Sequence, residues 1–315
     1  MTASVAAPAR AAVVGSGVMG AGIAHVLAAG GAQVTLYDPD AEVLPHAITR
    51  IEEMAKRLGQ DRGWIPERLA TTSDLAQAVE GASIVIEAGP ELLGVKQGIF
   101  RELTELVPAA AVLASNTSAI PIREIAAGLP LAGRILGTHF WHPPQLVPLV
   151  EVVKSDATED QSVDWTIALL EACGMRPVRI SADVPGFVGN RLQHALKREA
   201  IALVAAGVCD AETLDTVVKA GFGLRLGILG PLEQADLGGL DLTYKIHSVV
   251  MPALDNTPVP HPYLREKVER GEVGAKVGKG FREWEPGEAE KLRATVDDFL
   301  LEAASRRHQS PSSDD

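Results

Sequence analysis

The stretch Gly15-Ser16-Gly17-Val18-Met19-Gly20 decides the fold of this chain. It follows the apolar run Arg10–Gly15, which is typical of a buried strand, and it opens Val18–Ala29, whose small and apolar residues fit a helix. Glycine at its first, third and sixth positions allows a tight turn, close approach of the backbone to a pyrophosphate, and close packing of helix on strand. The free N–H groups at a helix N-terminus also favour a bound anion. The sequence therefore predicts a dinucleotide site formed by Gly15, Gly17, Val18, Met19 and Gly20.

The next predicted strand, Gln33–Asp38, indicates which dinucleotide is bound. It ends at Asp38, 18 residues past Gly20. A carboxylate at this position accepts hydrogen bonds from the adenosine ribose hydroxyls and repels a 2′-phosphate. Pro39 and Asp40 follow, and no arginine comes close behind them. We therefore expect NAD rather than NADP.

Short β-branched runs alternate with longer helical patterns up to Ile180, which is typical of βαβ units and a parallel sheet. The predicted strands are Arg10–Gly15, Gln33–Asp38, Ser83–Glu87, Ala111–Ser115, Arg134–Phe140, Val147–Val153 and Arg176–Ile180. The predicted helices are Val18–Ala29, Ala41–Leu58, Glu91–Leu106 and Thr158–Ala172. The fold class is therefore α/β, a Rossmann-type, mostly parallel, doubly wound sheet.

The pattern changes after the polar, Pro/Gly-containing joint Ser181–Gly186. Apolar residues then recur at helical spacing, and Asp210 is a suitable N-cap for a helix over Glu212–Ala220. We expect a nucleotide-binding domain over residues 1–183, an all-helical C-terminal domain over 184–304 and a disordered tail over 305–315. Ala41–Arg68 is longer than a crossover needs, and we expect it to project as a charged helical arm.

Composition excludes several classes of partner. The 315 residues carry 29 Lys and Arg against 41 Asp and Glu, a formal charge of −12, and only 4% are aromatic. Such a chain is a poor ligand for nucleic acid or for an anionic membrane, and no apolar run approaches the roughly 18 residues of a membrane span. Two cysteines give no disulfide framework, which favours a cytoplasmic location. Apart from His139 and His142, no two histidines have a spacing suited to a metal site, and we expect no metal.

His139 and Glu151 are candidates for the chemistry. His139 lies near the end of one predicted strand and Glu151 on the next, so adjacent strands can bring the two side chains together. Oxidation of an alcohol by NAD needs a base for the hydroxyl proton, and imidazole suits that task. A carboxylate on the far ring nitrogen fixes the tautomer and stabilises the imidazolium. From spacing alone, a purely structural His–Glu pair is an equally good interpretation.

Beyond these features, the chain resembles the 3-hydroxyacyl-CoA dehydrogenase family over nearly its whole length. The matching pieces are Gly15–Gly20, Glu87-Ala88-Gly89-Pro90-Glu91 with Lys96, Ser115-Asn116-Thr117-Ser118, His139-Phe140 with Pro143 and Glu151, Pro185-Gly186-Phe187-Val188-Gly189-Asn190-Arg191, Gly230-Pro231 with Asp236, Gly239-Leu240-Asp241, and Gly278-Lys279-Gly280-Phe281. Many ordered matches at the family spacing are far more specific than any single motif.

The resemblance implies roles for particular residues. His139 corresponds to the general base and Glu151 to its partner, while Ser118 and Asn190 correspond to residues that hold the hydroxyl and carbonyl oxygens of the substrate. Four residues correspond to family residues that line the cofactor or close over it: Glu91, Lys96, Lys276 and Ser118. The family's helical second domain binds substrate and forms a homodimer, so the resemblance implies both here, and it implies a place in fatty acid metabolism.

Departures from the family pattern leave the substrate open. His142 replaces an asparagine that is usual in the fatty-acyl members, and it either contacts the cofactor or substrate or fills space. Arg225 lies in a loop that is longer than in the fatty-acyl members and similar to that of small-hydroxy-acid branches, such as gulonate and carnitine dehydrogenases. In this chain Arg225 either clamps a substrate carboxylate or only packs across a turn. The first expectation is a 3-hydroxyacyl substrate as a CoA thioester. The alternatives are a free small 3-hydroxy carboxylic acid or a related alcohol and, more remotely, a non-catalytic NAD-binding protein.

Overall fold

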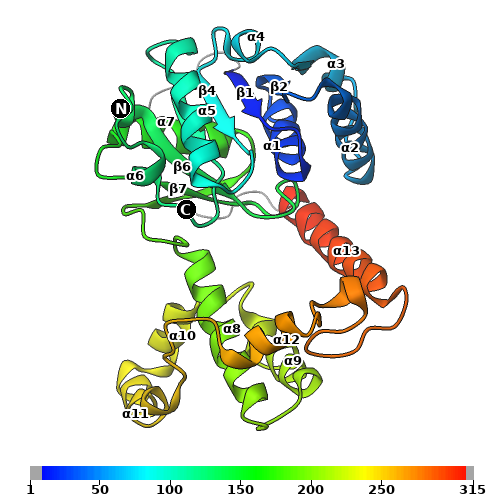
Figure 1. Cartoon of the computed structure of the whole chain (residues 1–315), viewed down its shortest axis with the longest axis vertical. Helices are drawn as coiled ribbons and strands as arrows, with labels where there is room; N and C mark the ends of the chain where they lie inside the picture. The colour runs from blue at the N-terminus through cyan, green and yellow to red at the C-terminus, as the bar shows by residue number, and fades with distance from the viewer. Residues whose placement is uncertain (1–8, 310–315) are drawn as a thin grey trace. The chain divides into compact units, whose positions relative to one another are not determined.

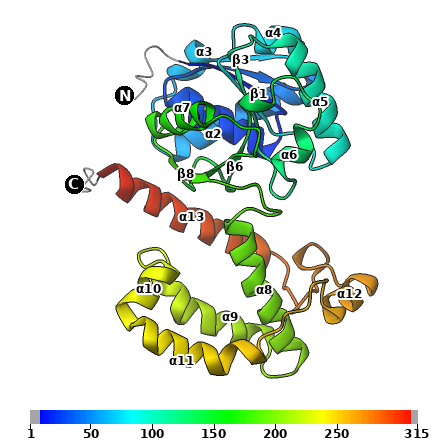
Figure 2. The same ribbon diagram turned by 90° about the vertical axis from the view of Figure 1, so that its left-hand side faces the viewer.

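The computed structural model describes residues 9–309, with side chains as far as Ser305. These residues form two compact units, which Figures 1 and 2 show in two views. The first unit contains the chain as far as Arg191 and again from Asp297, and the second unit is Leu192–Val296.

An eight-stranded sheet forms the centre of the first unit, in the order β3-β2-β1-β4-β5-β6-β7-β8. Every neighbouring pair is parallel except β6 and β7, which are antiparallel. The strands are β1 (Arg10–Val14), β2 (Gln33–Tyr37), β3 (Leu69–Thr72), β4 (Ile84–Glu87), β5 (Val112–Ser115), β6 (Ile135–Phe140), β7 (Leu149–Val153) and β8 (Arg176–Ile180). The strand order reverses at β1, and in open sheets of this kind ligands bind at such a point, outside the carboxyl ends of the strands.

Helices cover both faces of this sheet (Figure 2). They are α1 (Val18–Ala29), η1 (Ala41–Val43), α2 (Leu44–Arg57), α3 (Trp64–Arg68), α4 (Leu75–Val79), α5 (Leu93–Leu106), α6 (Ile122–Ile125), η2 (Ala132–Arg134) and α7 (Asp160–Ala172). Successive residues of β1 point to opposite faces, because the side-chain period of a strand is two. Val13 joins the core under α1, α2 and α7, while Val14 joins the core under α4, α5 and α6. The predicted doubly wound α/β fold is confirmed.

The second unit is helical. Its elements are most of α8 (Gly189–Ala205), α9 (Ala211–Ala220), η3 (Phe222–Arg225), α10 (Pro231–Gly238), α11 (Leu240–Val250), η4 (Met251–Ala253), α12 (Pro262–Glu269), η5 (Ala275–Val277) and the start of α13 (Glu288–Gln309). Asp210 caps α9 as the sequence predicts, since its Oδ1 accepts from the Thr213 N–H at 2.7 Å. Within residues 192–296 only Lys267 and Gly280 are buried, so this unit encloses almost no core of its own.

Three sequence-based expectations differ from the structure. The strand β3 was missed, because it is a four-residue edge strand with a single buried side chain. The stretch 41–68 does not project as an arm, because Leu44, Ala47, Ile51 and Ala55 form an apolar stripe that packs α2 into the core with α1. The predicted tail begins inside α13, which continues to Gln309, since no proline or glycine interrupts the chain before Pro311. Residues 310–315 of that tail lie outside the described residues.

Two further findings concern the whole described range. Over residues 9–309, no helix combines the length and the apolar character that crossing a bilayer requires. Within the same range, no group of three or more His, Cys, Asp or Glu side chains is arranged to hold a metal ion.

Candidate active site

The glycine turn between β1 and α1 has the geometry of a phosphate cradle. Gly15 has φ +104°, and a Cβ there would lie 2.9 Å from the Ala88 carbonyl oxygen, so only glycine fits. A Cβ on Gly20 would lie 1.8 Å from the Gly15 carbonyl oxygen, which forces close packing of the helix on the turn. A Cβ on Gly17, in contrast, would meet nothing within 4 Å. The open side of this turn therefore fits a closely approaching pyrophosphate.

The first turn of α1 keeps its N–H groups available. Its N-cap is Gly17, which provides no side-chain cap, and the first turn carries no acidic residue. Val18 is 56% exposed at the start of the helix, whereas Met19 packs against the core. The backbone of this turn, rather than the Met19 side chain, is thus the part that can face an anion.

Asp38 lies beside the same turn, just past the end of β2. Its Oδ2 accepts from the Ser16 N–H at 2.9 Å and from the Ser16 Oγ at 2.8 Å. Its Oδ1 accepts from the Asp40 N–H at 3.2 Å. Asp38 is therefore oriented toward the glycine turn, the place expected for a carboxylate that recognises ribose hydroxyls.

His139 and Glu151 face each other across the antiparallel pair β6 and β7, where they are direct register partners. The His139 Nδ1 and Glu151 Oε2 atoms are 2.8 Å apart, and both side chains are buried, at 5% and 2% exposure. With Glu151 ionised, Nδ1 carries the proton and donates it, which leaves Nε2 on the opposite side of the ring as a proton acceptor. His139 and Glu151 are therefore hydrogen-bonded to each other across adjacent strands, as the sequence predicts.

The second oxygen of Glu151 is also committed. Its Oε1 accepts from the backbone N–H groups of Val188 and Gly189, both at 3.0 Å. Burial raises the pKa of Glu151, but the hydrogen bond from His139 and the two backbone N–H groups outweigh it, and the net pKa is lowered. The carboxylate therefore stays charged and fixed against the imidazole.

Aromatic rings surround the imidazole. The rings of Trp141 and Phe187 lie 5.5 Å and 5.7 Å from that of His139, centroid to centroid, and both are tilted to it. A Cβ on Gly189 would lie 2.3 Å from the Trp141 ring, so glycine is required where the chain passes it. The Trp141 Nε1–H also donates to Glu151 Oε2 at 3.4 Å. Burial among these rings strengthens the electrostatic interaction between His139 and Glu151.

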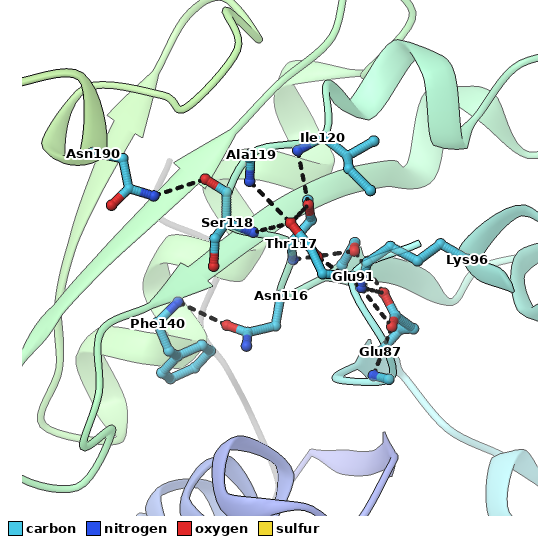
Figure 3. Close-up of polar contacts among 12 residues, drawn as sticks. Glu87, Glu91, Lys96, Asn116, Thr117, Ser118, Ala119, Ile120, Phe140 and Asn190 are labelled. Atoms are coloured by element: carbon cyan, nitrogen blue, oxygen red, sulfur yellow. Dashed lines mark hydrogen bonds and ion pairs between the residues drawn. The ribbon is translucent and has the colours of Figure 1, made fainter. Parts of the chain in front are cut away.

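Ser118 and Asn190, for which the family resemblance implies a role at the substrate, lie together (Figure 3). Ser118 follows β5 in an exposed turn, and its carbonyl oxygen accepts from Asn190 Nδ2 at 2.9 Å. Its backbone N–H donates to Glu91 Oε1 at 2.8 Å. Next to it, Asn116 Oδ1 accepts from the Phe140 N–H at 2.9 Å, which ties this turn to the strand that carries His139.

Glu91 and Lys96 differ in their surroundings. Glu91 is 42% exposed at its side chain, whereas Lys96 is 1% exposed. The Lys96 Nζ atom lies 2.8 Å and 2.9 Å from the two carboxylate oxygens of Glu87 and 3.4 Å from Glu91 Oε2. The ammonium group of Lys96 is therefore buried next to Glu91 and is held there by the buried carboxylate of Glu87.

The remaining predicted site residues are more dispersed. His142 is exposed and lines a cavity of about 230 Å³ together with residues of α1 and α2, among them Val18 and Arg50. Arg225, in η3, and Lys276, in η5, are exposed residues of the second unit. The structure thus brings together the glycine turn, the His–Glu pair and the 117–119 turn, all of them in the first unit.

Some functional groups escaped the sequence analysis. The backbone N–H groups that hold Glu151 and the buried carboxylate of Glu87 both act through contacts between distant parts of the chain. Glu87 was quoted only as part of a family motif, although a charged residue closing the apolar run of β4 is a signal that such a carboxylate has a partner.

The chain matches two family models in succession. Residues 10–184 match 3-hydroxyacyl-CoA dehydrogenase, NAD binding domain, and residues 186–284 match 3-hydroxyacyl-CoA dehydrogenase, C-terminal domain. Among curated proteins, it is 36% identical to 5-formyl-3-hydroxy-2-methylpyridine 4-carboxylate 5-dehydrogenase of Mesorhizobium japonicum, over 90% of this chain and 93% of that protein. It is 37% identical to the probable 3-hydroxybutyryl-CoA dehydrogenase of Bacillus subtilis, over 87% of this chain and 96% of that protein.

Solved structures of dehydrogenases are also similar to this chain. A structure of 5-formyl-3-hydroxy-2-methylpyridine 4-carboxylic acid 5-dehydrogenase, described as an NAD⁺-dependent dismutase, has a TM-score of 0.88 at 33% identity, covering 96% of this chain and 100% of that one. The (S)-3-hydroxybutyryl-CoA dehydrogenase of Ralstonia eutropha has a TM-score of 0.74 at 28% identity, covering 89% and 100%. With the glycine turn and the His–Glu pair in place, these matches lead to one conclusion: the chain is an NAD-dependent oxidoreductase and belongs to the 3-hydroxyacyl-CoA dehydrogenase family.

Proposed function

We propose that His139 is the general base of an NAD-dependent interconversion between a 3-hydroxyacyl group and its 3-oxo form, and that Glu151 is its partner. The observation that carries this proposal is the buried pair itself. Glu151 uses one oxygen to accept from His139 Nδ1 and the other to accept two backbone N–H groups, so the ring is held in the tautomer whose Nε2 can take a proton.

In the oxidising direction, His139 Nε2 takes the proton of the substrate hydroxyl as the C3–H bond breaks. The hydride from C3 passes to the nicotinamide of NAD, which is the chemistry that this cofactor supplies when bound. The C3–O bond becomes a carbonyl, and the products are the 3-oxo compound, NADH and a proton on His139. Glu151 stabilises the imidazolium that forms, because its carboxylate lies against Nδ1.

Ser118 and Asn190 are proposed to orient the substrate oxygens. The Asn190 amide already holds the peptide carbonyl of Ser118, so the two residues keep a fixed relation to each other. Fixing the reacting oxygen near the base contributes to catalysis through orientation and through stabilisation of the developing alkoxide. The glycine turn, Asp38 and the exposed carboxylate of Glu91 are proposed to hold the cofactor, and His142 and Lys276 to contact it.

The leading substrate is a 3-hydroxyacyl-CoA thioester. It is supported by the family models over residues 10–284 and by the similarity to the Bacillus subtilis protein. The test is NADH formation from 3-hydroxybutyryl-CoA, in parallel with a panel of free hydroxy acids. A kcat/KM at least about 100-fold higher for the thioester supports this substrate, and the reverse ratio assigns the chain to free acids.

A free small hydroxy acid is the second candidate, and a specific observation favours it. The pyridine-carboxylate dehydrogenase structure matches this chain with a TM-score of 0.88, above the 0.74 of the hydroxybutyryl-CoA enzyme. Arg225 is exposed, and a guanidinium there is proposed to clamp the carboxylate. For such a substrate, Arg225→Ala should raise KM at least about tenfold while kcat changes little, and an unchanged KM refutes the clamp.

A protein that binds NAD without turnover is the remote third candidate. The intact His139–Glu151 pair speaks against it, because a buried pair of this kind has no use in holding a nucleotide. A wide substrate screen that finds no NADH formation, while NADH raises the melting temperature, would favour it.

We also propose that the second unit forms a homodimer. Large apolar side chains are exposed over η3, α10, α11 and the loop between η3 and α10, at Leu224, Ile228, Leu232, Leu237, Leu240, Tyr244 and Val249. Ile228 is 93% and Leu232 80% exposed, and an apolar surface this large is typical of a protein interface. Light scattering should give twice the chain mass, and Ile228→Asp should give the single mass. Cytoplasmic location and a place in fatty acid metabolism stay predictions of the sequence.

A further inference from the structure

We infer that the buried ion pair Glu87–Lys96 is a positioning device for Ser118, acting through Glu91. The inference rests on the proposed role of Ser118 at the substrate. It assigns the ion pair an indirect function, which is to fix the turn that carries Ser118, rather than a direct contact with the cofactor. Glu87 and Lys96 are positioning residues in this account, because neither side chain is exposed enough to touch a ligand.

Glu87 is a fully buried carboxylate whose hydrogen bonds are saturated. It is 0% exposed at the carboxyl end of β4. Its Oε1 accepts from Lys96 Nζ at 2.8 Å and from the Gly89 N–H at 2.7 Å, and its Oε2 accepts from Lys96 Nζ at 2.9 Å and from Ser115 Oγ at 2.6 Å. The ammonium group is therefore fixed from β4 and β5 together.

Lys96 in turn fixes the carboxylate of Glu91. Its Nζ lies 3.4 Å from Glu91 Oε2, while Glu91 Oε1 accepts from Thr117 Oγ1 at 2.7 Å, from the Ser118 N–H at 2.8 Å and from the Ala119 N–H at 3.1 Å. Three donors thus converge on one carboxylate oxygen. The carboxylate caps the turn, and Lys96 holds its other oxygen in place.

The charge of Glu91 supports the same interpretation. Burial raises the pKa of Glu91, but the Thr117 hydroxyl, the Lys96 ammonium and the two backbone N–H groups outweigh burial and lower it. Glu91 is therefore an anion at neutral pH. A neutral side chain would hold the same three donors less strongly, since hydrogen bonds to a charged acceptor are about twice as strong as those to a neutral one.

Ser118 is consequently held from both sides. Its N–H is bound by Glu91, and its carbonyl oxygen is bound by Asn190 Nδ2 (Figure 3). The residue itself is exposed, and among residues 9–309 its Oγ makes no hydrogen bond. A clamped backbone with a free hydroxyl is the arrangement that presents the hydroxyl to a ligand in one orientation.

Stability alone does not account for the pair. Replacing a buried ion pair by neutral side chains of similar volume is often neutral for stability or even favourable, because both charges have to leave water. A buried ammonium that reaches from Glu87 to Glu91 instead fixes a polar turn, which an apolar side chain does not do.

The test is the double variant Glu87→Gln/Lys96→Met, measured with and without Ser118→Ala. Removing both charges leaves no unpaired buried ion, so the fold is retained. We expect kcat to fall about 10- to 100-fold, with the Kd of NADH changed less than about threefold. In the Ser118→Ala background, the same double change should lower kcat less than about twofold further, because the hydroxyl that the pair positions is already absent.

The matched control is Lys154→Met/Asp160→Asn, an ion pair between the end of β7 and the start of α7, next to the edge strand β8, which should leave kcat unchanged. An unchanged kcat in the Glu87/Lys96 variant, or a full additional loss in the Ser118→Ala background, overturns the inference. If Ser118→Ala alone leaves kcat unchanged, the proposed role of Ser118 fails instead, which is a distinguishable result.

A second variant keeps the test valid if the double variant does not fold. Ser115→Ala removes the 2.6 Å hydrogen bond to Glu87 and the 3.3 Å hydrogen bond from the Thr117 N–H, but it leaves the ion pair intact. We expect a three- to tenfold lower kcat that again disappears in the Ser118→Ala background. Failure of the double variant to fold, together with an unchanged kcat in Ser115→Ala, would assign the pair to the fold alone and overturn the inference.

Discussion

Replacing Glu151 by glutamine should disable the base without disturbing the fold. Oε1 of Glu151 already accepts from the N–H groups of Val188 and Gly189, so the amide oxygen of the variant must take that place. The amide NH₂ then faces His139 Nδ1, at the position where the carboxylate oxygen lies 2.8 Å away. Nδ1 has to accept instead of donate, so the ring proton moves to Nε2, the nitrogen that must take the substrate proton.

The size of the effect follows from two costs. Turning the amide to restore the reactive tautomer leaves two buried N–H groups without an acceptor, at about 1–3 kcal/mol each. A half-developed imidazolium charge about 4 Å from the carboxylate, at an effective dielectric constant of about 20, loses a further ~2 kcal/mol of attraction. A total of about 4 kcal/mol or more corresponds to a kcat about 10³-fold lower.

The assay is initial-rate NADH formation at saturating cofactor and substrate, alongside thermal unfolding and NADH titration. We expect kcat to fall about 10³-fold while the variant still unfolds in one cooperative transition and the Kd of NADH stays within error of the parent. Glu105→Gln, at an exposed position on α5, is the matched control and should be indistinguishable from the parent. A loss of kcat below about fivefold in the Glu151 variant would refute the reasoning, because the tautomer would then be irrelevant to turnover.

Three further predictions concern single residues. Gly20→Ala places a Cβ 1.8 Å from the Gly15 carbonyl oxygen, so the Kd of NADH should rise at least tenfold in a fluorescence titration, whereas Gly94→Ala, with nothing within 4 Å, should leave it unchanged. Burial raises the pKa of Cys173 to about 11, two units above its ordinary value, so iodoacetamide at pH 8 should label it about 100-fold more slowly than a free thiol; equally fast labelling would contradict its burial. The lowered pKa of Glu151 contributes stability that is present above about pH 4.5 and is lost as pH falls through the folded-state pKa. As the pH is lowered from 6 to 3, the melting temperature of Glu151→Gln should therefore decline less steeply than that of the parent. Parallel curves for the two proteins would contradict this.

Local patterns predicted the parts of the site that are local in the chain. The Gly15–Gly20 turn needs glycines for its backbone geometry, and Asp38 closes the strand that follows, so both were visible in the sequence. His139 and Glu151 could be paired because each lies on a predicted strand and neighbouring strands bring such residues together. The register that makes them direct partners, and the antiparallel direction of that pair, depend on tertiary structure.

Such local patterns could not predict the contacts that hold the site residues in place. The N–H groups of Val188 and Gly189 meet Glu151 across 37 and 38 residues of chain, and no spacing rule links them. The resemblance implies a cofactor role for Lys96, and a lysine is seldom fully buried unless it is paired. Its burial against Glu87 follows from how α5 packs on the ends of the central strands, which is a property of the assembled sheet.

The central claim, that the imidazole of residue 139 takes the substrate proton, is tested most directly by single-turnover hydride transfer in His139→Ala. The rate of NADH formation from pre-bound NAD and 3-hydroxybutyryl-CoA, or from the free acid that the substrate panel selects, should fall at least about 10³-fold while NADH binds with unchanged affinity. A single-turnover rate within a few fold of the parent, with the same affinity, would contradict the account.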